Sequence, residues 1–117
     1  MKGISETAFA SQVEDLLKLF GWRWTHFRPA WSSKGYRTPI KGDKGFPDYC
    51  CVRPPRLLFI ELKDQYTKST PEQEGWLEDL GECCKIIHNL TGREPTIIPE
   101  VYLFRPADIE RIMEILK

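Results

Sequence analysis

The chain has 117 residues, 41% of them hydrophobic and 29% charged, and its 17 basic residues balance its 17 acidic ones. This length suits one domain over residues 1–117 and is too short for two. A net charge of zero argues against a protein that coats nucleic acid through bulk electrostatics. Because no apolar stretch approaches the roughly 20 residues of a membrane span, we expect no membrane association and a cytoplasmic location.

The first predicted element is a helix over residues 5–20. Ser5 is a suitable N-cap and Gly21 a suitable stop. Apolar residues recur with the three-and-four spacing of one helical face, at Phe9, Val13, Leu16, Leu17 and Phe20. Glu6 projects onto the middle of that face. An acid in a first turn can simply complement the helix dipole, or Glu6 can meet a partner at the exposed end of the helix.

Residues 22–27 predict a strand, because aromatic residues and threonine are enriched there. A loop is predicted to follow over residues 28–45. From residue 23 to residue 44, basic residues are interleaved with aromatic ones: Arg23, Arg28, Lys34, Arg37, Lys41 and Lys44, with Trp24, Phe27, Trp31 and Tyr36. The mixture is typical of a loop that contacts phosphates and stacks on bases. A solvated loop whose aromatic side chains enter the core would have the same composition.

Two further strands are predicted over residues 46–52 and 57–63. The four-residue connection between them is short enough for an antiparallel hairpin. Successive side chains of a strand alternate between its faces. Glu61 and Lys63 should therefore share one face, and the opposite, core-facing side should hold Leu58, Ile60 and Leu62.

A second long helix is predicted to begin at Thr70. Thr70 suits the N-cap, proline suits the first helical position, and Gln73 can complete a reciprocal cap. The buried stripe would contain Leu77, Leu80, Cys84 and Ile87, with Trp76 at its border. Gln73 projects onto the centre of this stripe, so two predicted helices begin with a polar group that points inward. Gly92 is the expected end of the helix.

The rest of the chain predicts a connector over residues 93–99, a strand over 101–104 and a closing helix from Pro106. The inward side chains of that helix would be Ile109, Ile112, Met113 and Leu116. The predicted order is helix, strand, strand, strand, helix, strand, helix. We therefore expect an α/β fold without an internal repeat.

The four cysteines form two adjacent pairs, Cys50-Cys51 and Cys83-Cys84. Zinc sites usually space their thiols by two to four residues, and neighbouring residues of a strand face opposite ways. Core or surface thiols are the favoured interpretation. A small zinc protein or a disulfide remains the alternative.

Polar residues next to these apolar strands form a pattern that suits phosphodiester hydrolysis. The reaction needs a deprotonated water, an offset for phosphate charge and a stabilised leaving alkoxide, and a hard divalent cation supplies all three. Magnesium takes oxygen ligands, usually one or two carboxylates with water and phosphate. Asp48 and Glu61 on neighbouring strands supply such a pair, and the backbone carbonyl of Leu62 can add a third oxygen. We predict a metal site at Asp48, Glu61 and Leu62.

Other polar groups have expected roles beside that metal site. The Lys63 ammonium can offset phosphate charge or help to organise the attacking water. Glu6 would act through an outer-shell water or orient a ligand, and Gln73 would hydrogen-bond Lys63, water or phosphate. His26 and Arg28 can clamp phosphate, although a structural role is equally open. The catalytic candidates are Glu6, Asp48, Glu61, Lys63 and Gln73, and the nucleic-acid-binding candidates are His26, Arg28, Lys34, Arg37, Lys41 and Lys44.

The chain resembles the stand-alone VRR-NUC nucleases of phages and bacteria, which belong to the PD-(D/E)xK, or restriction-endonuclease-like, superfamily. The resemblance covers nearly the whole chain, and its most specific part pairs Gly45-Phe46-Pro47-Asp48 with Glu61-Leu62-Lys63. The other matching segments are Ser5-Glu6, His26-Phe27-Arg28-Pro29, Thr70-Pro71-Glu72-Gln73 with Trp76, and Val101-Tyr102-Leu103-Phe104-Arg105-Pro106.

This resemblance implies a central mixed sheet flanked by helices, dependence on Mg²⁺ or Mn²⁺, and DNA cleavage, often of branched structures such as Holliday junctions or flaps by a homodimer. It places the protein in DNA replication, recombination or repair in a bacterium or a phage-infected host cell. The alternative is a non-catalytic nucleic-acid-binding or phage-assembly adaptor that keeps the nuclease fold. Such an adaptor would usually have lost a ligand or the lysine, and here all are present.

Overall fold

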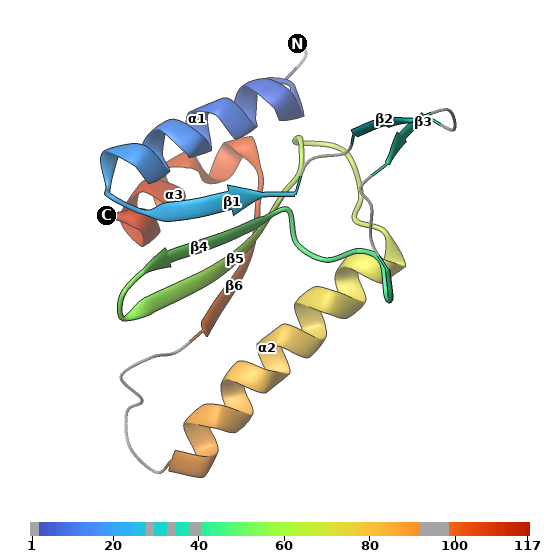
Figure 1. Cartoon of the computed structure of the whole chain (residues 1–117). Helices are drawn as coiled ribbons and strands as arrows, with labels where there is room; N and C mark the ends of the chain where they lie inside the picture. The colour runs from blue at the N-terminus through green and yellow to red at the C-terminus, as the bar shows by residue number, and fades with distance from the viewer. Residues whose placement is uncertain (1–2, 28–29, 33–34, 38–40, 92–98) are drawn as a thin grey trace.

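A computed structural model of the chain describes residues 3–27, 30–32, 35–37, 41–91 and 99–117. Its elements, shown in Figure 1, are α1 (Glu6–Leu19), β1 (Arg23–His26), β2 (Ala30–Ser32), β3 (Gly35–Arg37), β4 (Tyr49–Arg53), β5 (Arg56–Leu62), α2 (Pro71–Thr91), β6 (Pro99–Phe104), the short 3-10 helix η1 (Pro106–Asp108) and α3 (Ile109–Leu116). The protein is therefore a mixed α/β structure. None of the helices in these ranges is long and apolar enough to cross a membrane.

The main sheet has four strands in the order β1-β4-β5-β6. β4 is antiparallel to both β1 and β5, whereas β6 runs parallel to β5, so the sheet is mixed. The connection from β5 to β6 passes through α2, as a parallel pair requires. The α/β class is confirmed, with a four-stranded mixed sheet and the three helices α1, α2 and α3.

The prediction of one continuous loop over residues 28–45 is wrong, because β2 and β3 form a separate antiparallel hairpin. Trp31 pairs with Tyr36 across this hairpin, and Gly35 begins its second strand with a φ of +98°. Each strand has only three residues. A segment this short does not display enough alternation to be read as a strand.

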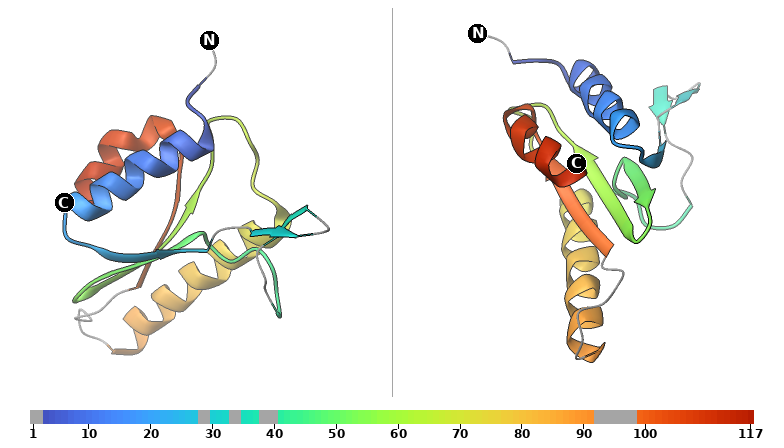
Figure 2. Two further views of the ribbon diagram at one scale, coloured as in Figure 1. Left: turned by 45° about the horizontal axis from the view of Figure 1, so that its top comes forward. Right: turned by 90° about the vertical axis from the view of Figure 1, so that its left-hand side faces the viewer.

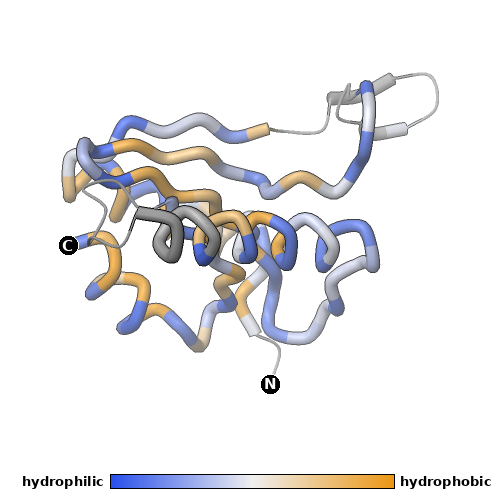
Figure 3. The backbone as a smooth tube through the Cα atoms, turned by 90° about the horizontal axis from the view of Figure 1, so that it is seen from below, coloured by the Kyte–Doolittle hydropathy of each residue, from blue (hydrophilic) through white to orange (hydrophobic). Residues whose placement is uncertain are grey.

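The helices cover the two faces of the main sheet. α1 and α3 lie side by side on one face, and α2 lies across the other (Figures 1 and 2). The core forms beneath α1 and α3 and contains Phe9, Val13, Leu17, Trp22, Tyr49, Cys51, Leu58, Ile60, Leu62, Phe104, Ile112 and Leu116. Hydrophobic segments run along the strands of the main sheet and recur in α3 (Figure 3).

Local capping interactions set the beginnings of α1 and α2. The Ser5 hydroxyl accepts a hydrogen bond from the backbone N–H of Ala8, which confirms the predicted N-cap. At α2, the Gln73 N–H donates to Thr70 Oγ1 while Gln73 Oε1 accepts from the Thr70 N–H, so the reciprocal cap is also confirmed. The expected end of α2 at Gly92 and the connector over 93–98 lie outside the described residues.

The predicted inner face of the closing helix needs one correction. Ile112 and Leu116 are fully buried, but 43% of Met113 is exposed. Ile112 and Leu116 are four residues apart and so lie on the same stripe of α3, whereas Met113 is rotated by about 100° from Ile112. The stripe of α3 that enters the core is therefore narrower than the apolar residues of its sequence predicted.

This difference between adjacent residues of α3 can be measured. Ile112→Ala should lower the free energy of unfolding by about 2–5 kcal/mol, because it leaves a cavity in the core. Met113→Ala should lower it by less than about 1 kcal/mol, because that side chain already contacts solvent. Urea unfolding of both variants tests the prediction, and equal losses would contradict this rotation of α3.

Candidate active site

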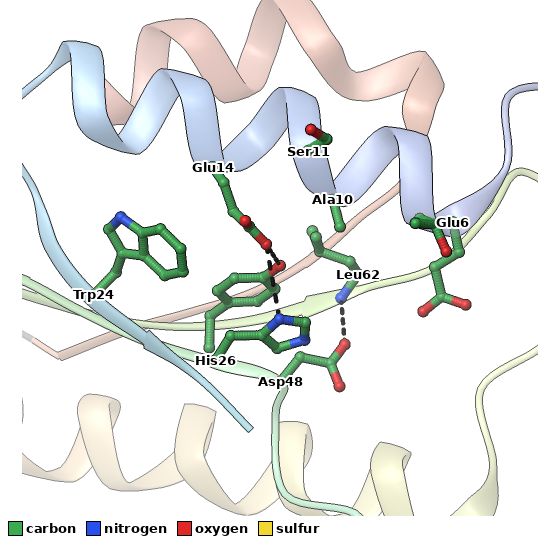
Figure 4. Close-up of a pocket in the computed structure, with 10 residues that line it drawn as sticks. Glu6, Ala10, Ser11, Glu14, Trp24, His26, Asp48 and Leu62 are labelled. Carbon is green, nitrogen blue, oxygen red and sulfur yellow. Dashed lines mark hydrogen bonds and ion pairs between the residues drawn. The ribbon is translucent and has the colours of Figure 1, made fainter. Parts of the chain in front are cut away.

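Asp48 lies where the chain enters the main sheet, immediately before β4. Its carbonyl oxygen accepts a hydrogen bond of 2.8 Å from the Phe27 N–H, and its Oδ2 accepts one of 3.2 Å from the Leu62 N–H (Figure 4). Tyr49 pairs with Ile60, so continuing that register places Asp48 opposite Glu61. At this end of the β4–β5 ladder, the Leu62 N–H thus donates to the side chain of Asp48 in place of a backbone carbonyl.

Glu61 and Lys63 project from the end of β5 away from the main core. Only 2% of Glu61 and 8% of Lys63 are exposed, and Lys63 Nζ lies 4.0 Å from Glu61 Oε1. The predicted alternation is confirmed, because Leu62 between them is part of the core. The site is more buried than a solvated strand edge would be. Ions at this depth depend on their partners for stability.

Gln73 links the start of α2 to this site. Its Nε2 donates a hydrogen bond of 3.0 Å to Glu61 Oε1, while its Oε1 accepts one from the Thr70 N–H. The same side chain therefore caps the helix and orients the Glu61 carboxyl group. The second oxygen of that group, Oε2, is buried and has no hydrogen-bond partner in the described part of the chain. A buried acceptor without a donor is costly, and a bound cation would satisfy it.

The turn before Asp48 is fixed against the first turns of α2. Gly45 has a φ of +99°, and a Cβ atom built there would lie 2.6 Å from the carbonyl carbon of Glu72. The Trp76 indole N–H donates to the carbonyl oxygens of Asp43 and Lys44, at 3.3 and 3.0 Å. These contacts hold the turn and the beginning of α2 together, so the positions of Asp48 and Gln73 are linked.

Burial raises the pKa values of the acidic side chains at the site, and repulsion by Asp48 adds to this shift in Glu61 and Glu6. Desolvation, together with the nearby Asp48 carboxylate, raises the pKa of Glu61 to about 8, although the Lys63 ammonium opposes this shift. Desolvation also raises the pKa of Asp48, against the hydrogen bond from Leu62. The pKa of Glu6 is raised by its own partial burial and then by Asp48. The site holds more acid than its lysine balances, which favours a cation.

Glu6 lies in the first turn of α1 and is exposed. Its carboxyl group is close enough to Asp48, Lys63 and Asp64 for their charges to shift its pKa. No direct hydrogen bond links Glu6 to Asp48 among the contacts of the described residues.

The geometry allows a hard cation but does not form a complete cage of side chains. Within the described residues, no three histidine, cysteine or acidic side chains gather as a ready ligand set. Asp48 and Glu61 are two carboxylates, and an extended strand directs the N–H and carbonyl of one residue to the same side. The Leu62 carbonyl is therefore expected on the Asp48 side of β5. Two carboxylates, one carbonyl and water are a suitable set for Mg²⁺.

An open pocket of about 720 Å³ lies next to Asp48, between α1 and the sheet (Figure 4). Sequence patterns singled out Glu6, Trp24, His26, Asp48 and Leu62 among its lining residues but not Thr7, Ala10, Ser11, Glu14 and Tyr49. One signal was present in the sequence. Positions 6, 10 and 14 are four residues apart, which places them on one face of a helix.

The predicted nucleic-acid-binding residues are only partly described. Lys41 and Lys44 are exposed, and Lys44 Nζ lies 3.7 Å from a carboxylate oxygen of Glu72. His26 lies inside the pocket. Arg28 and Lys34 lie outside the described residues, as does the side chain of Arg37, although its backbone belongs to β3.

The cysteines have no arrangement that suits zinc. All four thiols are free, and Cys51 is buried in the core while Cys50 on the opposite face is only partly buried.

Comparison with models of known protein families found no match for this chain, and comparison with curated proteins found none either. The residues of the site are therefore the features of this chain that bear on its function.

Two glycines provide a matched test of the contact between the turn and α2. Gly42 and Gly45 both have positive φ, so alanine at either position costs about 1–2 kcal/mol. Only at Gly45 would the added methyl also collide with the backbone of Glu72. Gly45→Ala should therefore lose about 1–3 kcal/mol more than Gly42→Ala in urea unfolding. Equal losses would show that the close approach is absent in solution.

The raised pKa of Glu61 predicts how the stability of the metal-free protein varies with pH. The folded state keeps this proton up to about pH 8, whereas the unfolded chain releases it near pH 4.5. The stabilisation is thus fully present below pH 4.5 and is lost as the pH rises through about 8.

With a chelator present, the free energy of unfolding should therefore fall between pH 5 and pH 8 more steeply in the wild type than in Glu61→Gln, which has no proton to release there. Chemical unfolding across this pH range measures both slopes. If the free energy of unfolding had the same pH dependence in both proteins, Glu61 would not have the raised pKa that its burial and the nearby Asp48 charge cause.

Proposed function

We propose that this protein is a divalent-metal-dependent DNA endonuclease with a restriction-endonuclease-like fold. One observation carries the proposal: a buried glutamate, Glu61, has an oxygen without a partner and lies beside a second carboxylate and a lysine. The order of the main elements, α1-β1-β4-β5-α2-β6-α3, supports it. This order brings the beginning of β4 and the end of β5 together near the beginnings of two helices.

The residues that would hold Mg²⁺ or Mn²⁺ are Asp48, Glu61 and the backbone carbonyl of Leu62. When bound, such a cation lowers the pKa of a coordinated water and offsets the negative charge of the phosphate. The orphaned Glu61 Oε2 and the raised pKa values of both carboxyl groups fit this assignment. Metal binding would replace the proton that Glu61 otherwise retains.

The chain's own side chains would position the reactants. Lys63 would place its ammonium against the phosphate oxygens and offset the charge that develops there. Gln73 keeps Glu61 in one orientation through its hydrogen bond to Oε1. Glu6, at the entrance of the site, would accept a hydrogen bond from the water that attacks the phosphorus atom.

DNA binding in this proposal uses the exposed basic residues that precede the site. Lys41 and Lys44 are exposed next to the turn that ends at Asp48. A DNA strand bound there would therefore pass close to the carboxylates of Asp48 and Glu61. The resemblance to VRR-NUC nucleases suggests a branched DNA substrate and a homodimer. Two copies would double the number of basic loops on a chain whose net charge is zero.

Removing either proposed metal ligand should abolish cleavage. Asp48→Asn and Glu61→Gln keep the size of each side chain but remove its charge, so each should reduce the rate by at least about 100-fold in Mg²⁺. The assay uses a panel of junction, flap, nicked and linear DNA with the purified proteins. A chelator should stop the wild type in the same way.

Asp15→Asn is the matched control, because Asp15 is an exposed acid on α1 and does not line the pocket. It should cleave at the wild-type rate. Full activity in either ligand variant would contradict the assignment. A wild type that binds DNA without cutting any substrate, in Mg²⁺ or Mn²⁺, would instead favour the non-catalytic adaptor.

A further inference from the structure

The pocket beside Asp48 has walls that hydrolysis alone does not require. Its roof is α1 and its floor is formed by β1 and β4, with Trp24 at one end and Glu6 at the other (Figure 4). Its volume of about 720 Å³ lies within the range of about 300–1,000 Å³ that small-ligand sites occupy. Asp48 belongs both to this pocket and to the proposed metal site, so an occupant would lie directly next to the reacting phosphate.

The charges in the pocket indicate which part of a nucleotide it can accept. Among the described residues, its lining contains the carboxyl groups of Glu6, Glu14 and Asp48 and neither lysine nor arginine. A phosphate would be repelled by these groups. The pocket therefore suits a neutral group that donates hydrogen bonds.

Aromatic rings in the pocket provide surfaces for stacking. The His26 ring is stacked on Tyr49 with centroids 4.1 Å apart, and the Trp24 ring is tilted against Tyr49 at 5.9 Å. The Tyr49 hydroxyl donates a hydrogen bond to Glu14 Oε2, and His26 Nδ1 lies 3.7 Å from the same oxygen. These contacts fix the rings and the Glu14 carboxylate in one arrangement. Aromatic faces bind bases, and carboxylates accept hydrogen bonds from their amino groups.

We propose that this pocket receives one unstacked nucleobase from a nucleotide next to the cut phosphate, and that it favours the bases with an exocyclic amino group, cytosine, adenine and guanine, over thymine. The inference rests on the proposed endonuclease function and adds a base subsite to it. Glu14 accepts the hydrogen bond from the amino group, and Trp24 contacts the face or edge of the base.

The test combines abasic substitution in the DNA with a change in the pocket. After the cut site is mapped, each nucleotide within two positions of it is replaced in turn by an abasic analogue, and single-turnover cleavage is measured. Removing the base at one position should slow the wild type between about fivefold and 100-fold. Thymine at that position should be cleaved more slowly than cytosine, adenine or guanine.

Trp24→Ala should bring the ratio of the rates for intact and abasic DNA towards one. Ala10→Phe is a second variant, whose larger side chain fills the pocket from α1 (Figure 4), and it should have the same effect if Trp24→Ala fails to fold. Leu19→Ala removes an exposed apolar side chain at the far end of α1 and should keep the wild-type ratio. Equal cleavage of all abasic substrates by the wild type would overturn the proposal, as would an unchanged ratio in both pocket variants.

A binding measurement separates this inference from the proposed function. If the wild type cuts no DNA, the endonuclease proposal fails, and the pocket is tested by NMR titration of the metal-free protein with deoxycytidine and with thymidine. Deoxycytidine should shift the amide signals of Thr7, Ser11 and Trp24 more than thymidine does. Absence of such shifts would overturn the base subsite.

Discussion

The burial of the Glu61 carboxyl group is the constraint on which the rest of this structure depends. A carboxylate removed from water needs partners, and here one oxygen accepts from Gln73 while the other has no hydrogen-bond partner within the described residues. Asp48 adds repulsion, and Lys63 offsets it only in part. An apolar residue at this position would be simpler for stability alone. Retaining an acid here makes sense if a cation and a phosphate complete the site.

The neighbouring elements hold this unfavourable group in place through contacts that serve two purposes at once. Gln73 begins α2 by capping Thr70 and also orients Glu61. Asp48 continues the β4–β5 ladder through its side chain and also directs a carboxylate to the site. The close approach of Gly45 to α2 links the position of Asp48 to that of Gln73. The site is therefore preorganised by the same interactions that define the fold, which is what catalysis by a fixed electrostatic environment requires.

Sequence patterns predicted the parts of this arrangement that local chemistry determines. The alternation in β5 placed Glu61 and Lys63 on one face, and the caps at Ser5 and Thr70 set the starts of two helices. The hairpin of β2 and β3 was missed because its strands are too short to show a period. The pocket was missed because Glu14, Trp24 and Tyr49 come from three elements, and only their packing brings them together. The exposure of Met113 likewise depends on how α3 is rotated against the sheet.

The central claim is that Asp48 and Glu61 converge on one hard cation. Crystals soaked in Mn²⁺ and measured near the manganese absorption edge would test it most directly, because the anomalous signal locates the ion without reference to catalysis. We predict one strong peak within coordinating distance of both carboxyl groups and of the Leu62 carbonyl. A peak elsewhere, or carboxyl groups that stay empty at saturating Mn²⁺, would contradict the account.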